Sequence, residues 1–111
     1  MISNSTFTDE AEAYEQIKAA GYYPFTADYP AVNNDFHWHD FDSLTYITAG
    51  ELTVTERDSG ETKTFGPGTK LVGVAGVVHR ERSAGYSAIF GLAVDPKTLS
   101  KPVEKPVEKP V

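Results

Sequence analysis

The stretch Phe36-His37-Trp38-His39-Asp40-Phe41-Asp42-Ser43 decides how the rest of the chain is interpreted. His37 and His39 are two of the three histidines in the chain and are separated by one residue. Side chains on an extended strand alternate between its faces, so residues i and i+2 point the same way. The spacing predicts two imidazoles side by side, and imidazole is the commonest metal-binding side chain. Alone, such a short motif is equally compatible with two ordinary histidines in an aromatic cluster.

Length and composition limit the function classes. The 111 residues suffice for one domain, and the absence of cysteine excludes disulfides, thiolate metal sites and cysteine nucleophiles. The net charge is −6, and the end of the chain from Pro96 onward is the basic part. An acidic body argues against nucleic acid and anionic membranes as partners, because both need Lys/Arg surfaces.

No apolar run is long enough to span a membrane, and the first residues lack the charged start and apolar core of a signal peptide. We therefore expect a cytoplasmic protein.

Residues 1–21 are predicted to form a helical lead-in. Asp9, with Glu12 three residues later, resembles a capping box, and Thr8 is the other candidate cap. Gly21 is suited to the C-terminal stop.

Residues 22–95 are expected to form the β-domain. From Leu44 to Val94 about seven short strands alternate with glycine-containing turns, a spacing typical of an antiparallel sandwich or barrel. No long helix interrupts them, which argues against a parallel sheet. Residues 96–111 contain a Lys-Pro-Val-Glu repeat and are predicted to be an extended, disordered, Pro-rich tail. We expect residues 97 to 111 to be mobile and dispensable.

The spacing around the first two histidines resembles the first motif of the cupin superfamily: Gly, five residues, His-x-His, three or four residues, Glu, six residues, Gly. Ala31 stands at the first glycine, His37 and His39 match the histidines, and Gly50 matches the last glycine. Ser43 stands where the glutamate belongs.

The third histidine lies where the second cupin motif has one: Gly, five residues, Pro-x-Gly, two residues, His, three residues, Asn. Gly68, Gly76 and His79 match this motif, whereas Val74 replaces the proline and Ser83 the asparagine. The resemblance covers residues 31 to 83. It implies an all-β, cupin-like antiparallel β-barrel (a double-stranded β-helix or jelly roll) with a short N-terminal helix, and it suggests a homodimer.

The resemblance also implies one divalent metal ion held by His37, His39 and His79. We favour Fe²⁺ for function, and Zn²⁺, Ni²⁺, Mn²⁺ or Cu²⁺ also suit imidazole. Asp42 and Ser43 are the candidates for a fourth ligand. Serine is a poor ligand, and Asp42 would point to the opposite strand face unless the chain bends. Strand parity therefore favours a three-histidine site, which would leave the ion its full charge for an anionic substrate.

Three further residues are predicted to lie at the pocket. Thr45 and Ile47 share the strand face of Ser43. Glu81 is two residues from His79, so it could face inward as a partner for an imidazole N–H; a solvated carboxylate at the strand end is the interpretation that we favour.

Two functions fit this sequence. One is a metal-dependent, dioxygenase-like oxidoreductase acting on a small molecule, and the other is a non-catalytic or regulatory cupin that binds a small molecule, with a structural or absent metal. No catalytic residue can be assigned from the sequence, and the fold does not decide between them.

Overall fold

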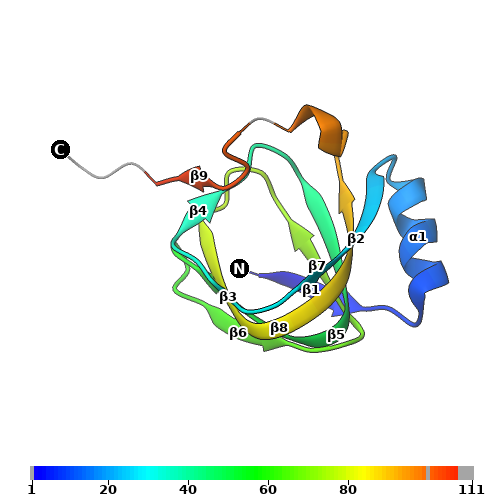
Figure 1. Cartoon of the computed structure of the whole chain (residues 1–111), viewed down its shortest axis with the longest axis horizontal. Helices are drawn as coiled ribbons and strands as arrows, with labels where there is room; N and C mark the ends of the chain where they lie inside the picture. Colours follow the sequence, from blue (N-terminus) through cyan, green and yellow to red (C-terminus); the bar gives the residue numbers. More distant parts are fainter. Residues whose placement is uncertain (1, 100, 108–111) are drawn as a thin grey trace.

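In the computed structural model, which describes residues 2–99 and 101–107, one antiparallel sheet curls around an interior (Figure 1). The elements follow in the order β1 (Ser3–Thr6), α1 (Glu10–Ala19), β2 (Tyr23–Tyr29), β3 (Val32–Asn33), β4 (His37–Trp38), β5 (Ser43–Glu56), β6 (Thr62–Phe65), β7 (Thr69–Gly73), β8 (His79–Leu92), the 3₁₀ helix η1 (Pro96–Thr98) and β9 (Lys105–Pro106).

The long strands β5 and β8 pair with each other and form the middle of the sheet. Strands β7 and β6 pair with the other edge of β5, and β1 pairs with β7. Strands β2, β3 and β4 lie in succession along the other edge of β8. This arrangement confirms the predicted all-β architecture with a short N-terminal helix and fits a jelly-roll barrel.

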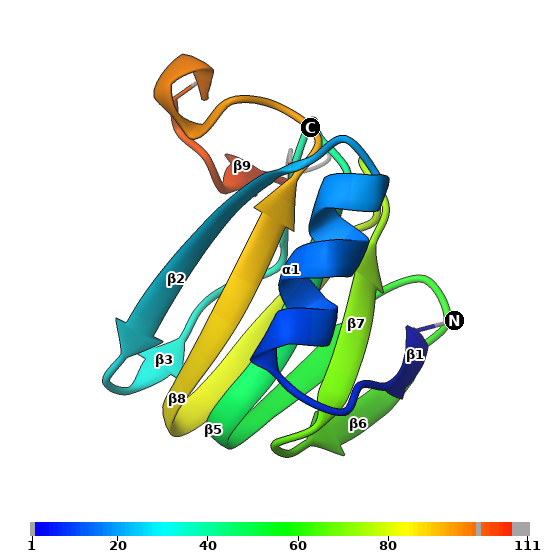
Figure 2. The ribbon, with the colours of Figure 1, turned by 90° about the vertical axis from the view of Figure 1, so that its right-hand side faces the viewer.

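Helix α1 covers the outer face of the sheet (Figure 2). It starts where predicted, since the Asp9 carboxylate accepts a hydrogen bond from the backbone N–H of Glu12. Ile17 packs on β8 at Gly91, where an added Cβ would come within 2.7 Å of the Ile17 side chain. The glycine therefore lets the helix approach the strand closely.

Among the described residues, the sheet has two buried apolar clusters. One lies under helix α1 and includes Ile17, and the other lies in the interior. It consists of Ile47, Leu52, Val54, Phe65, Tyr86 and Ala88. Gly50 turns the chain inside β5 with a φ of 75°, and a Cβ there would overlap the carbonyl oxygen of Gly85. This positive φ and close approach explain the glycine at that position of the predicted motif.

Residues 101–107, which we call the C-terminal strap, lie against the body. Strand β9 pairs with β4, and the backbone carbonyls of Val103 and Pro106 accept hydrogen bonds from the His39 and Trp38 rings. The sequence predicts a solvated, disordered tail here, because proline cannot donate to a ladder. Backbone carbonyls can still accept, however, and the rings of Trp38 on β4 and of His39 directly after it supply N–H donors. Residues 100 and 108–111 of that tail lie outside the described residues.

The described helices include none that is long and apolar enough to cross a membrane.

Candidate metal centre

The three histidines converge from two strands. His37 on β4 is the register partner of His79 at the start of β8, and His39 follows directly after β4. The ring centroids are 4.5 Å apart for His37 and His79, 5.0 Å for His37 and His39, and 5.4 Å for His39 and His79. Antiparallel pairing of β4 with β8 thus joins residues 42 positions apart in one cluster.

All three imidazoles are held in the same way. Nδ1 of His37 lies 2.8 Å from the Asp35 carbonyl oxygen, Nδ1 of His79 lies 2.9 Å from that of Val77, and Nδ1 of His39 lies 2.9 Å from that of Val103. A carbonyl oxygen can only accept, so each neutral ring carries its proton on Nδ1. The lone pair is then left on Nε2, and hydrogen bonds of this kind orient metal-ligating histidines.

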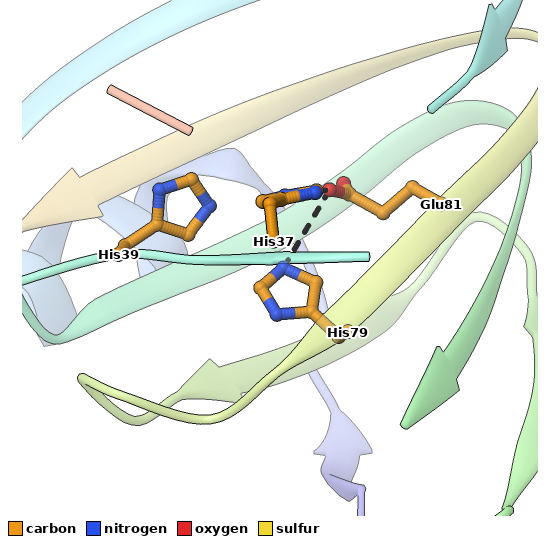
Figure 3. Close-up of side chains that lie close together, drawn as sticks. All are labelled: His37, His39, His79 and Glu81. Carbon is orange, nitrogen blue, oxygen red and sulfur yellow. Dashed lines mark ion pairs between the residues drawn. The ribbon is translucent and has the colours of Figure 1, made fainter. Parts of the chain in front are cut away.

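Glu81 completes the cluster. It lies two residues along β8 from His79, and its carboxylate points at the imidazoles (Figure 3). Its Oε1 is 3.3 Å from Nε2 of His37 and 3.6 Å from Nε2 of His79. Each of the four residues offers one ligand atom, and these atoms all lie within 4.8 Å of one another.

This donor set fits a divalent metal ion. Ligand atoms at about 2.0–2.2 Å from an ion are at most about 4.4 Å apart, so the four donors need only small movements to share one. The clearest sign is Nε2 of His37, which is buried and makes no hydrogen bond; its 3.3 Å contact with Glu81 is an ion-pair contact only. A buried polar atom without a hydrogen bond is costly unless another group satisfies it.

The charges in the cluster are coupled. Burial by itself would raise the pKa of Glu81, but its close contacts with the His37 and His79 imidazoles outweigh burial and hold that pKa far below its usual value. Burial would lower the pKa of His37, yet Glu81 and the Asp35 carbonyl raise it. Burial lowers the pKa of His39, with the neighbouring histidines adding to the effect. Glu81 is therefore an anion at neutral pH and available as a ligand.

The centre opens into a cavity of about 630 Å³. His39, His79 and Glu81 line it, and most of the remaining wall is apolar. Two stacked aromatic pairs lie along β2 and β8: Phe25 with Phe90, 5.1 Å between centroids, and Tyr29 with Tyr86, 5.2 Å. The described lining residues include glutamates but no lysine or arginine.

Comparison with solved structures identifies the fold. A cupin-2 domain protein from Shewanella frigidimarina superposes with a TM-score of 0.53 and 18% identity, over 79% of this chain and 76% of that one. The polyketide cyclase RemF from Streptomyces resistomycificus gives 0.58 and 15%, over 97% and 72%. Bacillus subtilis oxalate decarboxylase, described for its Mn(II) centres, gives 0.52 and 15%, over 88% of this chain but 27% of that one.

This chain has the fold of a small cupin domain. No family model and no curated protein matches its sequence, so the relationship rests on the fold. The predicted cupin resemblance is confirmed at that level, and the cupin barrel explains why histidines from two distant motifs meet.

The two candidates for a fourth ligand lie outside the four-residue cluster. Asp42 is exposed, and its carboxylate accepts a hydrogen bond of 2.8 Å from the backbone N–H of Ala75. Ser43 is half-buried and lines the cavity, with its hydroxyl beside Gly73, where an added Cβ would lie 2.4 Å from it. The chain thus bends after β4 in a way that directs Asp42 towards the loop before β8.

The predicted pocket residues divide into two groups. Thr45 and Glu81 line the cavity, whereas Ile47 is fully buried in the interior cluster. The sequence favours a solvated role for Glu81, but the structure places it among the imidazoles. The sequence does contain a signal for this position of Glu81, because Glu81 has the same i, i+2 relation to His79 that His39 has to His37.

Proposed function

We propose that this cupin is a metal-dependent, oxygenase-like enzyme whose ion is held by His37, His39, His79 and Glu81. The convergence of four donor atoms supports this proposal, together with the Nδ1 hydrogen bonds that leave each Nε2 free. It replaces the carboxylate-free site favoured by the sequence with one that includes a glutamate.

The residues of the chain would have distinct tasks. The histidines supply neutral nitrogen ligands in a fixed tautomer, and Glu81 supplies one negative charge. When bound, Fe²⁺ would supply redox chemistry towards dioxygen, whereas Zn²⁺, Ni²⁺, Mn²⁺ or Cu²⁺ would polarise a bound oxygen atom. The apolar cavity wall would exclude bulk water from the reacting groups.

The cavity also bears on the substrate class. A Glu81 carboxylate partly neutralises a divalent ion, and no described lysine or arginine lines the cavity to bind a second anionic group. The stacked rings of Phe25 with Phe90 and Tyr29 with Tyr86 offer flat apolar surface. We therefore propose an uncharged, largely apolar substrate with an oxygen or sulfur atom that can coordinate the ion, in place of the anionic substrate expected from the sequence.

Metal analysis of anaerobically purified protein tests the proposal first. It should give one equivalent of a transition metal per chain. Oxygen uptake is then measured with neutral diketones, with thiols and with hydroxy acids, which are anionic at neutral pH. We expect uptake with a neutral compound and little with hydroxy acids. A clear preference for hydroxy acids would contradict the proposed substrate class.

The non-catalytic alternative gives a different result in the same experiment. A binding protein would retain the metal and bind an apolar compound without consuming oxygen. The cavity beside the centre favours the enzyme, because side chains do not fill the space next to His39, His79 and Glu81.

A further inference from the structure

The C-terminal strap reaches the metal centre at one atom. Nδ1 of His39 lies 2.9 Å from the carbonyl oxygen of Val103, which is 64 residues away in the chain. By contrast, Nδ1 of His37 and Nδ1 of His79 each bond a carbonyl two residues earlier in their own segment. Two histidines are therefore oriented locally, and the third takes its acceptor from the strap.

Further contacts hold the strap in register beside β4. Strand β9 pairs Pro106 with His37 and Lys105 with Trp38. The Trp38 indole N–H donates to the Pro106 carbonyl over 3.3 Å, and the Lys105 ammonium lies 3.8 Å from the Asp40 carboxylate. These contacts involve residues on both sides of His39 in the sequence, so they fix where the Val103 carbonyl lies relative to the His39 ring.

The strap also forms part of the cavity wall. Val103 and Glu104 are among the residues that line the cavity, and the Glu104 carboxylate accepts a hydrogen bond of 3.4 Å from the Asn34 side chain. The same segment thus touches a ligand of the centre and the space in which a substrate would lie.

We propose that the strap is a positioning element of the metal centre, in which the Val103 carbonyl holds His39 in the Nδ1–H tautomer with Nε2 directed at the ion. This inference rests on the proposed metal-dependent function and adds to it a segment that the sequence predicts to be dispensable. Losing a hydrogen-bond partner of a metal-ligating histidine costs about 10- to 100-fold in metal affinity.

The body does not depend on the strap for its core. Both buried clusters and all pairings among β1 to β8 involve residues before position 93. A chain that ends at residue 99 should therefore fold, and its metal-free melting temperature should stay close to that of the full chain. The matched control ends at residue 107, which keeps every strap contact described above.

The experiment compares Zn²⁺ affinity, by chelator competition, in the chains 1–99 and 1–107. We expect chain 1–107 to match the full chain and chain 1–99 to bind Zn²⁺ about 10- to 100-fold more weakly. In the full chain, Trp38→Phe, which removes the indole donor to Pro106, should weaken binding in the same direction by less. Equal affinity of the two truncated chains would overturn the proposal.

A second measurement uses the metal-free protein and separates the strap from the proposed function. Because the chain has three histidines, ¹⁵N spectra of the imidazoles can be assigned. His39 should be the Nδ1–H tautomer in chain 1–107 and a mixture of tautomers in chain 1–99, with His37 and His79 unchanged. An unchanged His39 would refute the strap's role. If neither chain binds Zn²⁺, the metal centre is wrong, and the tautomer of His39 still decides the role of the strap.

Discussion

Glu81→Gln is the substitution that most sharply separates the centre seen here from one without a carboxylate. Glutamine has nearly the same shape, so packing is retained while the negative charge is removed. Glu81 Oε1 lies 3.3 Å and 3.6 Å from two histidine Nε2 atoms, so a bound ion would contact this oxygen directly. We expect metal affinity to fall by at least the roughly 10- to 100-fold found for losing a partner of a ligand, or about 1.4–2.8 kcal/mol.

The matched control is Asp42→Asn. Asp42 is exposed and accepts from the Ala75 N–H, a hydrogen bond that the asparagine side-chain oxygen can keep. Its metal affinity should stay close to that of the unsubstituted protein. Chelator competition with Zn²⁺ or Co²⁺ measures both variants. A greater loss for Asp42→Asn than for Glu81→Gln would make Asp42 the fourth ligand and contradict the proposed role of Glu81.

Three other predictions concern the fold, the cavity and pH. Gly91→Ala should destabilise the protein by about 1–3 kcal/mol in urea unfolding, since its Cβ would crowd Ile17, and combining it with Ile17→Ala should cost less than the sum of the two single effects; strict additivity would argue against this contact. Ser43→Ala should change metal affinity by about twofold or less, and loss of the metal would make Ser43 a ligand or its support. In metal-free protein, Glu81→Gln should destabilise more at about pH 5.5 than at about pH 8.5, as measured by urea unfolding, and the reverse order would contradict the proposed pairing of Glu81 with His37. The larger effect is expected at the lower pH because the pKa of His37 is raised in the folded protein, and the stability from this shift is lost as pH rises through that pKa. The lowered pKa of Glu81 also contributes stability, but this contribution is lost only in strong acid.

Much of the candidate site follows from local rules. Strand parity places His37 and His39 on one surface, and the distant His79 is brought in by the spacing of the second motif. The helix start at Asp9 and the turn at Gly50 likewise follow from capping and from the left-handed backbone of glycine. The histidine pair, the helix start and the turn each depend on a few neighbouring residues, so the sequence is sufficient to predict them, whereas His79 is assigned through the cupin resemblance.

What the sequence does not reveal depends on long-range pairing. Strand parity puts Glu81 on the same face as His79, but whether that face meets the His37 imidazole depends on the register of β8 with β4. The bend that directs Asp42 to Ala75 likewise depends on a contact between residues that are far apart in the sequence. The strap is the plainest case, because its composition is that of a solvated tail while its carbonyls accept from the rings of Trp38 and His39. The homodimer and the cytoplasmic location expected from the sequence remain predictions.

We propose that three histidines and Glu81 bind one metal ion through Nε2 and a carboxylate oxygen. A crystal structure of metal-loaded protein, with the ion located by its anomalous scattering, would identify the ligands. We predict one peak at about 2.0–2.2 Å from Nε2 of His37, His39 and His79, with a Glu81 oxygen as the fourth protein ligand. A peak bound through Nδ1, one that includes Asp42 in place of Glu81, or a His79 that points out of the barrel would contradict the account.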